Sequence, residues 1–331
     1  MKNAKLKFMA LMLVVVMALT GCMTEDITLK INSDGSGVCD ITEVVDEEAL
    51  MDTAIKLYKV MGMPAADIDL IKGELKQSFK ESYLDQGFKS VSIDGKQCYQ
   101  LTEHKNIKKG QLSKEVMQGG QGYITTDTFY LKLNLSSMME DSLMSLLGED
   151  MSRQELELML KTAGIDLNSA VTFKISVEFP KAIVSTNGTI DTANPNKVSF
   201  KGTAATNREI FATTNPKVTL DSARAKYKAD NTIKQPKIKK LKANKVSKKA
   251  KKATVTLKFS KVSGAKKYQV QYSTKSSFKG AKTKTIKKTT YKITKLKKKK
   301  KYYVRVRAVK YNLSGEVVNS KWTKKSVKTK K

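Results

Sequence analysis

The chain has 331 residues, of which 40% are hydrophobic and 28% charged, and its net charge is +32. Residues 231–331 hold 36 of the 63 Lys and Arg residues but only one of the 31 acidic residues, Glu316, so this segment carries +35 and residues 1–230 carry −3. The hydrophobic content is sufficient for ordinary cores. The uneven distribution of charge does not fit a single evenly charged domain, so we expect two domains with different electrostatic roles.

The first 22 residues predict an export signal. Three lysines precede an apolar run from residue 8 to residue 19, and a run of about 12 residues is too short to cross a bilayer core, which takes about 20. A basic start, a short apolar run and a small-residue site are typical of a secretory signal peptide. No later stretch of the sequence is long and apolar enough to span a membrane, so we expect the rest of the chain to lie outside the cytoplasm.

The signal ends in residues that resemble the lipobox of bacterial lipoproteins. The resemblance implies that residues 1–21 are removed and that the Cys22 thiol carries a diacylglyceryl group at the mature N-terminus. Two acyl chains suffice for stable anchoring, at about 0.8 kcal/mol per buried methylene, so we expect a protein anchored to the cell membrane on its extracytoplasmic face. The alternative is an uncleaved anchor with an incidental cysteine. The residues of the lipobox are Leu19, Thr20, Gly21 and Cys22.

The segment after the signal predicts a hairpin followed by a helix. Residues 27–45 are typical of two strands joined by a turn at Asp34 and Gly35, because Asp-Gly is a preferred pair for a tight hairpin turn. Asp46 is the expected N-cap of a helix that ends at Pro64, with carboxylates in its first turn opposing the helix dipole.

The remaining pattern up to residue 215 predicts further strands and helices. Their order, strands then helices then strands, favours an α+β fold with an antiparallel sheet. We therefore expect residues 22–215 to form one α+β domain. The predicted elements are a helix over residues 67–84, a hairpin over 88–103, strands over 126–135 and 171–180, a helix from Ser152 to Gly164 with a capping box, and a returning strand within 187–200.

Short motifs in this region resemble a family of surface lipoproteins. The cysteine-anchored start, the SDGSG turn and the segment FPKAIVSTNGTIDTANPNKVSF are similar to the LppM-like lipoprotein domain of Gram-positive bacteria. The resemblance covers about residues 25–215, and it implies a surface lipoprotein that binds lipid or another envelope component. Members of that family often end in a transmembrane helix and a short tail, and the sequence here predicts neither.

Cys39 and Cys98 each follow a predicted hairpin turn and lie in a predicted strand. In an exported chain the two thiols can form a disulfide; the alternative is that both are buried as small apolar side chains. His104 is the only histidine, and it has no partner at a metal-binding spacing. Five methionines provide either core packing or the lining of a groove for a hydrophobic ligand; they are Met138, Met139, Met144, Met151 and Met159.

Residues 216–235 are polar and weakly periodic, and we expect a linker. Short alternating segments follow, which favours an all-β sandwich. The segment SGAKKYQVQYS, the position of Leu296 six residues before Tyr302 and the late SKWT resemble the fibronectin type III family, in which Tyr302 corresponds to the tyrosine corner. The resemblance implies an immunoglobulin-like sandwich for residues 236–331.

The basic domain contains the candidate binding residues. Strand alternation predicts that two glutamines on one strand, and a tyrosine and two arginines on another, face outward. The fibronectin resemblance implies that these two strands pair, so the five side chains share one face, and a lysine run lies at one end of it. Guanidinium groups, amides and an aromatic ring suit an anionic or sugar polymer; the alternative is a lysine-rich surface that is only solvated. The candidates are Gln269, Gln271, Lys297, Lys298, Lys299, Lys300, Lys301, Tyr303, Arg305 and Arg307.

The sequence contains no nucleotide-binding, metal-binding or catalytic motif that we recognise, and Asp46, Glu47 and Glu48 fit a helix cap better than a catalytic pair. We therefore expect a non-enzymatic protein without cofactor or metal, whose basic domain binds anionic wall polymers or anionic lipid headgroups. Specific nucleic-acid binding is not expected, because the chain is exported and has no recognition helix. One alternative is a carrier or sensor that binds a lipid in the first domain, and another is an unrecognised hydrolase. The sequence predicts no oligomeric state.

Overall fold

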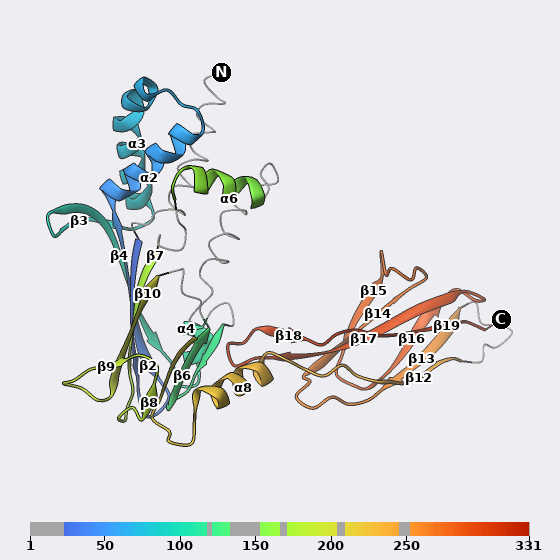
Figure 1. The fold of residues 1–331 in the computed structure, drawn as a ribbon. Coiled ribbons are helices and arrows are strands. Elements are labelled where there is room, and N and C mark those ends of the chain that lie inside the picture. The colour runs from blue at the N-terminus through green and yellow to red at the C-terminus, as the bar shows by residue number, and fades with distance from the viewer. Residues whose placement is uncertain are drawn as a thin grey trace. The chain divides into compact units, whose positions relative to one another are not determined.

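The chain forms two compact units, of which the first ends at Leu220 and the second begins at Asp221. The computed structural model describes residues 23–117, 121–132, 153–165, 171–203, 209–244 and 252–330, and Figure 1 shows their fold. Both units are mostly β-sheet, and most of the helices belong to the first. No helix in these described ranges is long and apolar enough to cross a membrane.

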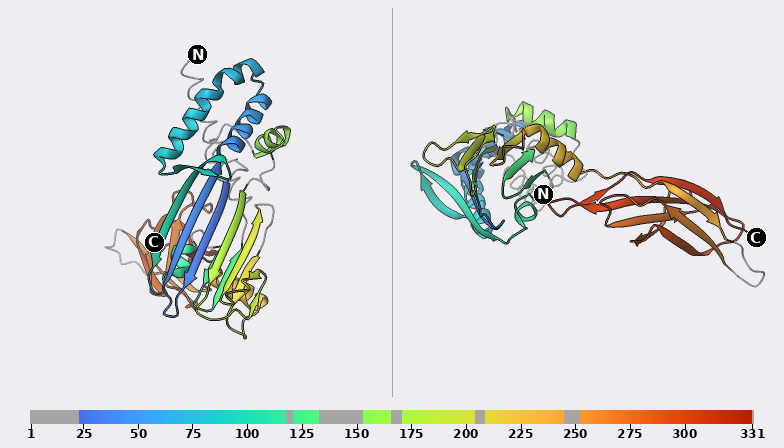
Figure 2. Two further views of the ribbon diagram at one scale, coloured as in Figure 1. Left: turned by 90° about the vertical axis from the view of Figure 1, so that its left-hand side faces the viewer. Right: turned by 90° about the horizontal axis from the view of Figure 1, so that it is seen from below.

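The first unit is built on a seven-stranded sheet that has the first strand of the chain near its centre (Figure 2, left). Strand β1 pairs antiparallel with β2 but parallel with β7, so the expectation of a purely antiparallel sheet is wrong at this pair. Parallel neighbours are not joined by a tight turn, and no local turn signal marks this pairing in the sequence. The order is β3-β4-β2-β1-β7-β10-β9, with β1 (Met23–Ile31), β2 (Gly37–Asp46), β3 (Lys89–Ile93), β4 (Lys96–Ile107), β7 (Val171–Glu178), β9 (Thr189–Ile190) and β10 (Lys197–Thr203).

A four-stranded sheet packs on one face of the large sheet. The two sheets share one core, in which Leu29 of β1, Val177 of β7 and Phe129 of the small sheet are almost fully buried. Thr28, next to Leu29, is exposed, as expected when alternate residues of a strand face opposite sides. The small sheet has the order β5-β6-β11-β8, with β5 (Gly122–Ile124), β6 (Thr128–Lys132), β8 (Ser185–Thr186) and β11 (Glu209–Thr213), and the short helix α4 (Leu112–Val116) contributes to the same core.

Three helices form a second core at one end of the large sheet (Figure 2, left). The Asp46 carboxylate caps the first of them by accepting hydrogen bonds from the backbone N–H groups of Glu48 (3.0 Å) and Ala49 (3.1 Å), as the sequence predicts. Leu57 of this helix packs in one cluster with Tyr99 of β4. The helices are α2 (Glu47–Val60), α3 (Ala65–Asp85) and α6 (Arg153–Thr162), and the expected capping residue Ser152 lies outside the described residues.

The second unit is a sandwich of two antiparallel sheets around its own core. The alternate residues of β17 that the sequence predicts to face inward, Tyr302, Val304, Val306 and Ala308, are buried in it. One sheet has the order β12-β13-β16; the other has the order β15-β14-β17, and both β18 and β19 pair with β17. The strands are β12 (Ile238–Ala243), β13 (Ala253–Phe259), β14 (Lys267–Ser273), β15 (Lys282–Ile286), β16 (Thr290–Leu296), β17 (Lys301–Tyr311), β18 (Val317–Asn319) and β19 (Thr323–Lys328).

Tyr302 makes the contact expected of a tyrosine corner. Its hydroxyl accepts a hydrogen bond from the backbone N–H of Lys297 at 3.0 Å, which ties the turn between β16 and β17 to the start of β17. The Thr329 hydroxyl accepts a second hydrogen bond, from the N–H of Lys300, at 2.9 Å. The lysine run is therefore a turn with a fixed backbone, as its position between two predicted strands indicates.

The segment predicted to be a linker, residues 216–235, contains helix α8 (Leu220–Asp230). The Lys310 ammonium of β17 donates a hydrogen bond to the Ala229 carbonyl at 2.8 Å, and it thereby satisfies one of the carbonyls that the end of a helix leaves unpaired. Ala223 is the one buried residue of this helix. Because the helix buries so little, its sequence carries almost no apolar periodicity, and sequence analysis missed it.

A disulfide between Cys39 and Cys98 is ruled out. In the β2–β4 ladder Cys39 lies opposite Lys105, and Cys98 lies opposite Asp46. The two cysteines are therefore about seven positions apart along the ladder, or about 23 Å at 3.3 Å per residue, whereas a disulfide needs Cα atoms within about 7 Å. Both thiols are free and buried, and burial raises the pKa of each, so they act as small apolar side chains.

Candidate functional site

One outer face of the sandwich carries two arginines that are each held by a glutamine. In the β14–β17 ladder Gln269 lies opposite Arg307, and Gln271 lies opposite Arg305. The Nε–H group of each arginine donates to the Oε1 atom of its glutamine at 2.8 Å. These side chains face outward because the residues that alternate with them on β17 fill the core. We call this surface the arginine face; it consists of Gln269, Gln271, Tyr303, Arg305 and Arg307.

Aromatic rings stack on both guanidinium groups. The Cζ atom of Arg305 lies 4.5 Å from the centre of the Trp322 ring and 4.2 Å from the centre of the Phe278 ring. The Cζ atom of Arg307 lies 4.6 Å from the centre of the Trp322 ring. Such contacts are attractive and restrict the arginine side chain. Each guanidinium thus has an amide on its Nε–H group and at least one aromatic ring close to its Cζ atom.

The outward edge of each guanidinium is available to a ligand. A guanidinium has five N–H donors, and in the described part of the chain Arg305 and Arg307 each use one, on a glutamine, with no carboxylate partner. Partial burial and the neighbouring charge of Arg305 lower the pKa of Arg307, as expected for two cations that lie together without a counter-ion. The arrangement can therefore receive an anion through two fixed donor groups.

The lysine run lies at one end of the arginine face. The side chains of residues 297–300 are exposed except that of Lys298, which is half-buried. Lys301 begins β17, and its ammonium lies 5.3 Å from the centre of the Tyr303 ring. The predicted residues are therefore gathered on one stretch of sheet and on the turn that adjoins it.

Four further side chains of this region were not predicted from the sequence. Lys324 and Lys328 of β19 lie opposite Arg305 and Lys301 of β17, and the two stacking rings, Trp322 and Phe278, come from outside the strands. A signal for Trp322 was available, because it is the only tryptophan of the chain and adjoins the predicted last strand. Phe278 lies in a turn at a φ of +62°, where strand alternation makes no prediction.

The other residues considered for chemistry have partners of their own. Glu47 is buried, accepts a hydrogen bond from the Tyr99 hydroxyl and forms an ion pair with Lys76 at 2.7 Å. The Nδ1 atom of His104 lies 2.6 Å from the Asp40 carboxylate, and both side chains are about half exposed. Among the described residues, no group of three or more His, Cys, Asp and Glu side chains is placed to hold a metal ion.

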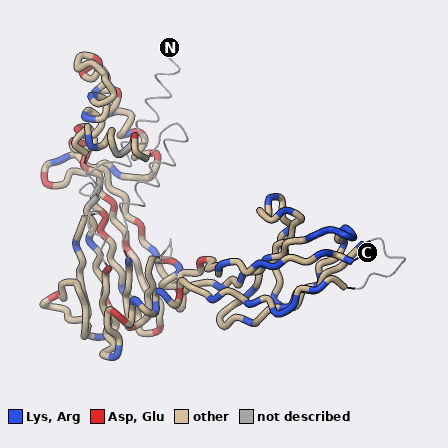
Figure 3. The backbone as a smooth tube through the Cα atoms, turned by 45° about the vertical axis from the view of Figure 1, so that its right-hand side comes forward, with Lys and Arg blue, Asp and Glu red and all other residues tan. Residues whose placement is uncertain are grey.

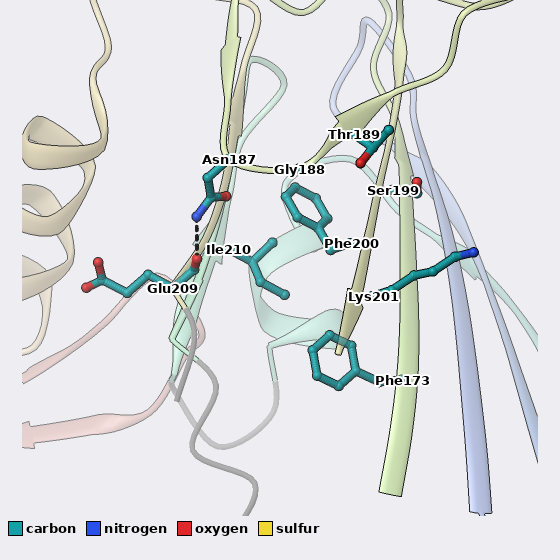
Figure 4. Close-up of a pocket in the computed structure, with 9 residues that line it drawn as sticks. All are labelled: Phe173, Asn187, Gly188, Thr189, Ser199, Phe200, Lys201, Glu209 and Ile210. Atoms are coloured by element: carbon teal, nitrogen blue, oxygen red, sulfur yellow. Dashed lines mark hydrogen bonds between the residues drawn. The ribbon is translucent and has the colours of Figure 1, made fainter. Parts of the chain in front are cut away.

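The first unit contains a cavity of about 310 Å³ between its two sheets. Figure 4 shows the rings of Phe173 and Phe200 and the side chain of Ile210 around it. Asn187 closes one side through a hydrogen bond from its Nδ2 atom to the Glu209 carbonyl. The volume is at the lower end of the range of small-molecule sites.

Of the five predicted methionines the structure describes only Met159, which does not line this cavity. Met159 packs against the helical core, whereas Met138, Met139, Met144 and Met151 lie outside the described residues. Among the described residues, the apolar lining of the cavity comes from Phe173, Phe200 and Ile210.

Comparison with known proteins identifies the sandwich. The family model for the fibronectin type III domain matches residues 238–321. Solved structures similar to the chain include FN3tt (23% identity, 30% of this chain and 95% of that chain, TM-score 0.23), a Fn3-like protein from Clostridium thermocellum (29%, 28% and 91%, 0.21) and the fn3 domain of human collagen alpha-1(XX) chain (19%, 31% and 89%, 0.23). No curated protein matches the chain. The C-terminal part of the chain, residues 238–321, is a fibronectin type III domain.

Proposed function

We propose that the chain is a lipid-anchored, non-enzymatic protein of the cell surface, whose basic fibronectin type III domain binds anionic polymers of the cell envelope. The observation that supports this most is the arginine face, where Arg305 and Arg307 are held in place and lack a carboxylate partner in the described part of the chain. An unpaired and partly buried cation costs free energy, so stability alone does not account for two such arginines side by side.

The surroundings of the arginine face support the same proposal. Residues 231–331 contain 36 basic residues and one acidic residue, and Figure 3 shows Lys and Arg along the strands of the second unit. Like charges at this density repel one another and destabilise the domain. An anionic polymer against the surface relieves that repulsion, so the composition favours such a partner.

The proposed location rests on the first residues of the chain. A diacylglyceryl group on Cys22 would anchor the chain to the membrane, and β1 begins at the next residue, Met23. The first unit, which we propose to be an LppM-like domain, would then lie against the membrane surface. Wall polymers and anionic lipid headgroups are the polyanions that an exported, anchored protein meets, and nucleic acid is not.

The proposal is tested by sedimenting the protein with purified cell walls. We expect the detergent-solubilised full chain to sediment at low salt and to be released at high salt, because contacts between exposed charges are screened. A matched chain that ends at Leu220 should stay in solution. Failure of the full chain to bind walls, wall polymers and anionic vesicles in dilute buffer would exclude the proposed binding. Incorporation of labelled palmitate into the chain, and its loss in Cys22→Ser, tests the anchor separately.

The cavity of the first unit favours a second candidate function, a carrier of a hydrophobic ligand. Its lining by Phe173, Phe200 and Ile210 suits a short acyl or aromatic group, and the second unit would then be a spacer. We expect a ligand that co-purifies with the chain and appears in organic extracts by mass spectrometry. Ile210→Trp, which fills the cavity, should lose it, whereas Ile190→Trp, at a partly exposed position of β9, should keep it. Absence of any co-purified ligand from both the parent chain and Ile190→Trp would contradict this candidate.

A further inference from the structure

We infer that the arginine face recognises phosphate groups that repeat along a polymer, rather than negative charge in general. This inference rests on the proposed binding of anionic polymers and names the group that is bound. The Nε–H groups of Arg305 and Arg307 are occupied by Gln271 and Gln269, and in the described part of the chain the two Nη atoms of each guanidinium have no hydrogen-bond partner. This pair of donors forms a fork that matches two oxygens of one phosphate.

The two forks are held at a fixed separation. Arg305 and Arg307 are two residues apart on β17, which places their Cα atoms about 7 Å apart on the same side of the strand. Both guanidinium groups contact the one Trp322 ring, so they cannot splay apart independently. Neighbouring phosphates of a polymer with a short repeat can therefore occupy both forks at once, and the second contact gains from the local concentration that the first creates.

The adjoining strand favours phosphate over carboxylate. Lys324 of β19 lies directly opposite Arg305, and its side chain is exposed. A tetrahedral phosphate directs oxygens out of the guanidinium plane, so it can accept hydrogen bonds from the fork and from a neighbouring ammonium together. A carboxylate bound by the fork keeps acceptor sites only in its own plane, so none points toward an ammonium above that plane. Three donors around one site thus match a phosphate better than a carboxylate.

The test exchanges arginine and lysine without changing the charge. In the full chain, Arg305→Lys/Arg307→Lys removes both forks and keeps both cations. The matched control, Lys240→Arg/Lys258→Arg, adds two guanidinium groups to the outer face of the other sheet, where Lys240 and Lys258 are exposed and lie opposite each other. The probes are poly(glycerol phosphate), polyglutamate of the same number of charges and dextran sulfate. Binding is followed by the fluorescence of Trp322, the only tryptophan, and by sedimentation.

We expect the parent chain and the control to bind poly(glycerol phosphate) more tightly than polyglutamate. Arg305→Lys/Arg307→Lys should lose about tenfold in affinity for poly(glycerol phosphate) and change little for polyglutamate. Equal binding of all three polymers with no effect of the arginine exchange would overturn the inference and leave the proposed polyanion binding intact. No binding of any polymer in dilute buffer would overturn both.

Vesicles that contain phosphatidylglycerol separate a polymer from a lipid surface, because both offer phosphate. We expect the soluble polymer to compete the chain off such vesicles. Arginine-dependent binding to vesicles without binding to the polymer would overturn the assignment to a polymer. Thermal unfolding of each variant, monitored by circular dichroism, tests whether the sandwich is folded in every comparison.

Discussion

The two outer faces of the sandwich are both basic, but only one of them orders its charges. On the β12-β13-β16 sheet, Lys240 lies opposite Lys258, and Lys292 lies opposite Thr256. These three lysines are exposed, and in the described part of the chain none has an ion-pair partner or an aromatic ring over it. On the arginine face, in contrast, both guanidinium groups are held by amides and rings.

This difference means that one face attracts anions without fixing them, whereas the other can bind a particular anionic group in a defined geometry. We call the surface of Lys240, Lys258 and Lys292 the lysine face. A flexible lysine that is immobilised loses rotamer freedom, which costs up to about 2 kcal/mol, so the lysine face attracts anions mainly through its electrostatic field. The arginines have lost that freedom already in folding, and less is lost per hydrogen bond when a ligand binds. We therefore expect changes on the arginine face to alter affinity more strongly than equal changes of charge on the lysine face.

The largest effect is expected from Gln269→Glu/Gln271→Glu. Each new carboxylate would lie against the Nε–H group of an arginine, as the amide does now, so it would form an ion pair and cancel the exposed charge. Affinity for poly(glycerol phosphate) should fall by more than about tenfold, while the free energy of unfolding stays the same or rises by up to about 1 kcal/mol. Isothermal titration and chemical denaturation measure the two quantities.

The control for this variant adds two carboxylates to the lysine face. Thr256→Glu/Thr290→Glu also adds two negative charges. It places them opposite Lys292 and Lys258, which are the strand partners of Thr256 and Thr290 on that sheet. We expect a loss of affinity of about threefold or less, since exposed charges beyond a Debye length are screened. Equal losses in both variants would show that total charge alone determines binding, and the contrast between the two faces would be lost.

A smaller effect is expected from Trp322→Leu, which removes the ring that both guanidinium groups contact. Two cation–π contacts at a half-buried site contribute about 1–3 kcal/mol together, so the sandwich should become less stable by about this amount. Affinity for poly(glycerol phosphate) should fall by about three- to tenfold because the arginines gain freedom. Because this variant has no tryptophan, calorimetry measures its stability and sedimentation measures its affinity. An affinity that is unchanged in the folded variant would contradict the role of the ring.

Strand alternation is the reason that the arginine face could be predicted. The period of two on β17 fixes which residues face outward, and the fibronectin resemblance placed the strand of Gln269 and Gln271 beside it. The hairpin at Asp34 and the cap at Asp46 were predictable for a similar reason, because each depends on a few neighbouring residues. These are local signals, and the structure contains the elements that they indicate.

The features that the sequence did not reveal depend on contacts between distant segments. The parallel pairing of β1 with β7 leaves no turn motif, and the separation of Cys39 from Cys98 becomes apparent only from the register of β2 and β4. Phe278 reaches Arg305 from a turn, and helix α8 buries one residue. The turn that holds Phe278 and the sequence of helix α8 both lack a periodic apolar pattern, so neither strand alternation nor helical spacing could predict them.

Alanine substitutions on each face compare the two faces by affinity and by salt dependence, and the effect of the lysine substitutions is expected to be small. Lys240→Ala/Lys258→Ala should lower the affinity for poly(glycerol phosphate) about two- to threefold and leave the salt dependence almost unchanged, because these side chains do not touch the bound polymer. Arg305→Ala/Arg307→Ala should clearly reduce the slope of log affinity against log salt, because counter-ions are no longer released from two phosphates. Titrations at several salt concentrations give both slopes, and equal reductions would place the polymer on both faces.

The smallest effect is expected from Lys258→Glu, which concerns stability alone. Lys258 lies opposite Lys240, and like charges at directly opposite positions of antiparallel strands are unfavourable by about 0.2–1 kcal/mol. The substitution turns repulsion into attraction, so the free energy of unfolding should rise by roughly that amount at low salt and by less at high salt. Lys292→Glu, whose partner is the uncharged Thr256, provides the matched control and should gain less. No fixed contacts offset the repulsion between lysines on the lysine face. A larger gain in stability for Lys258→Glu than for the control would therefore show that these lysines destabilise the domain when no ligand is bound. Equal gains would show that they do not, and charge repulsion would then no longer favour a polyanionic partner.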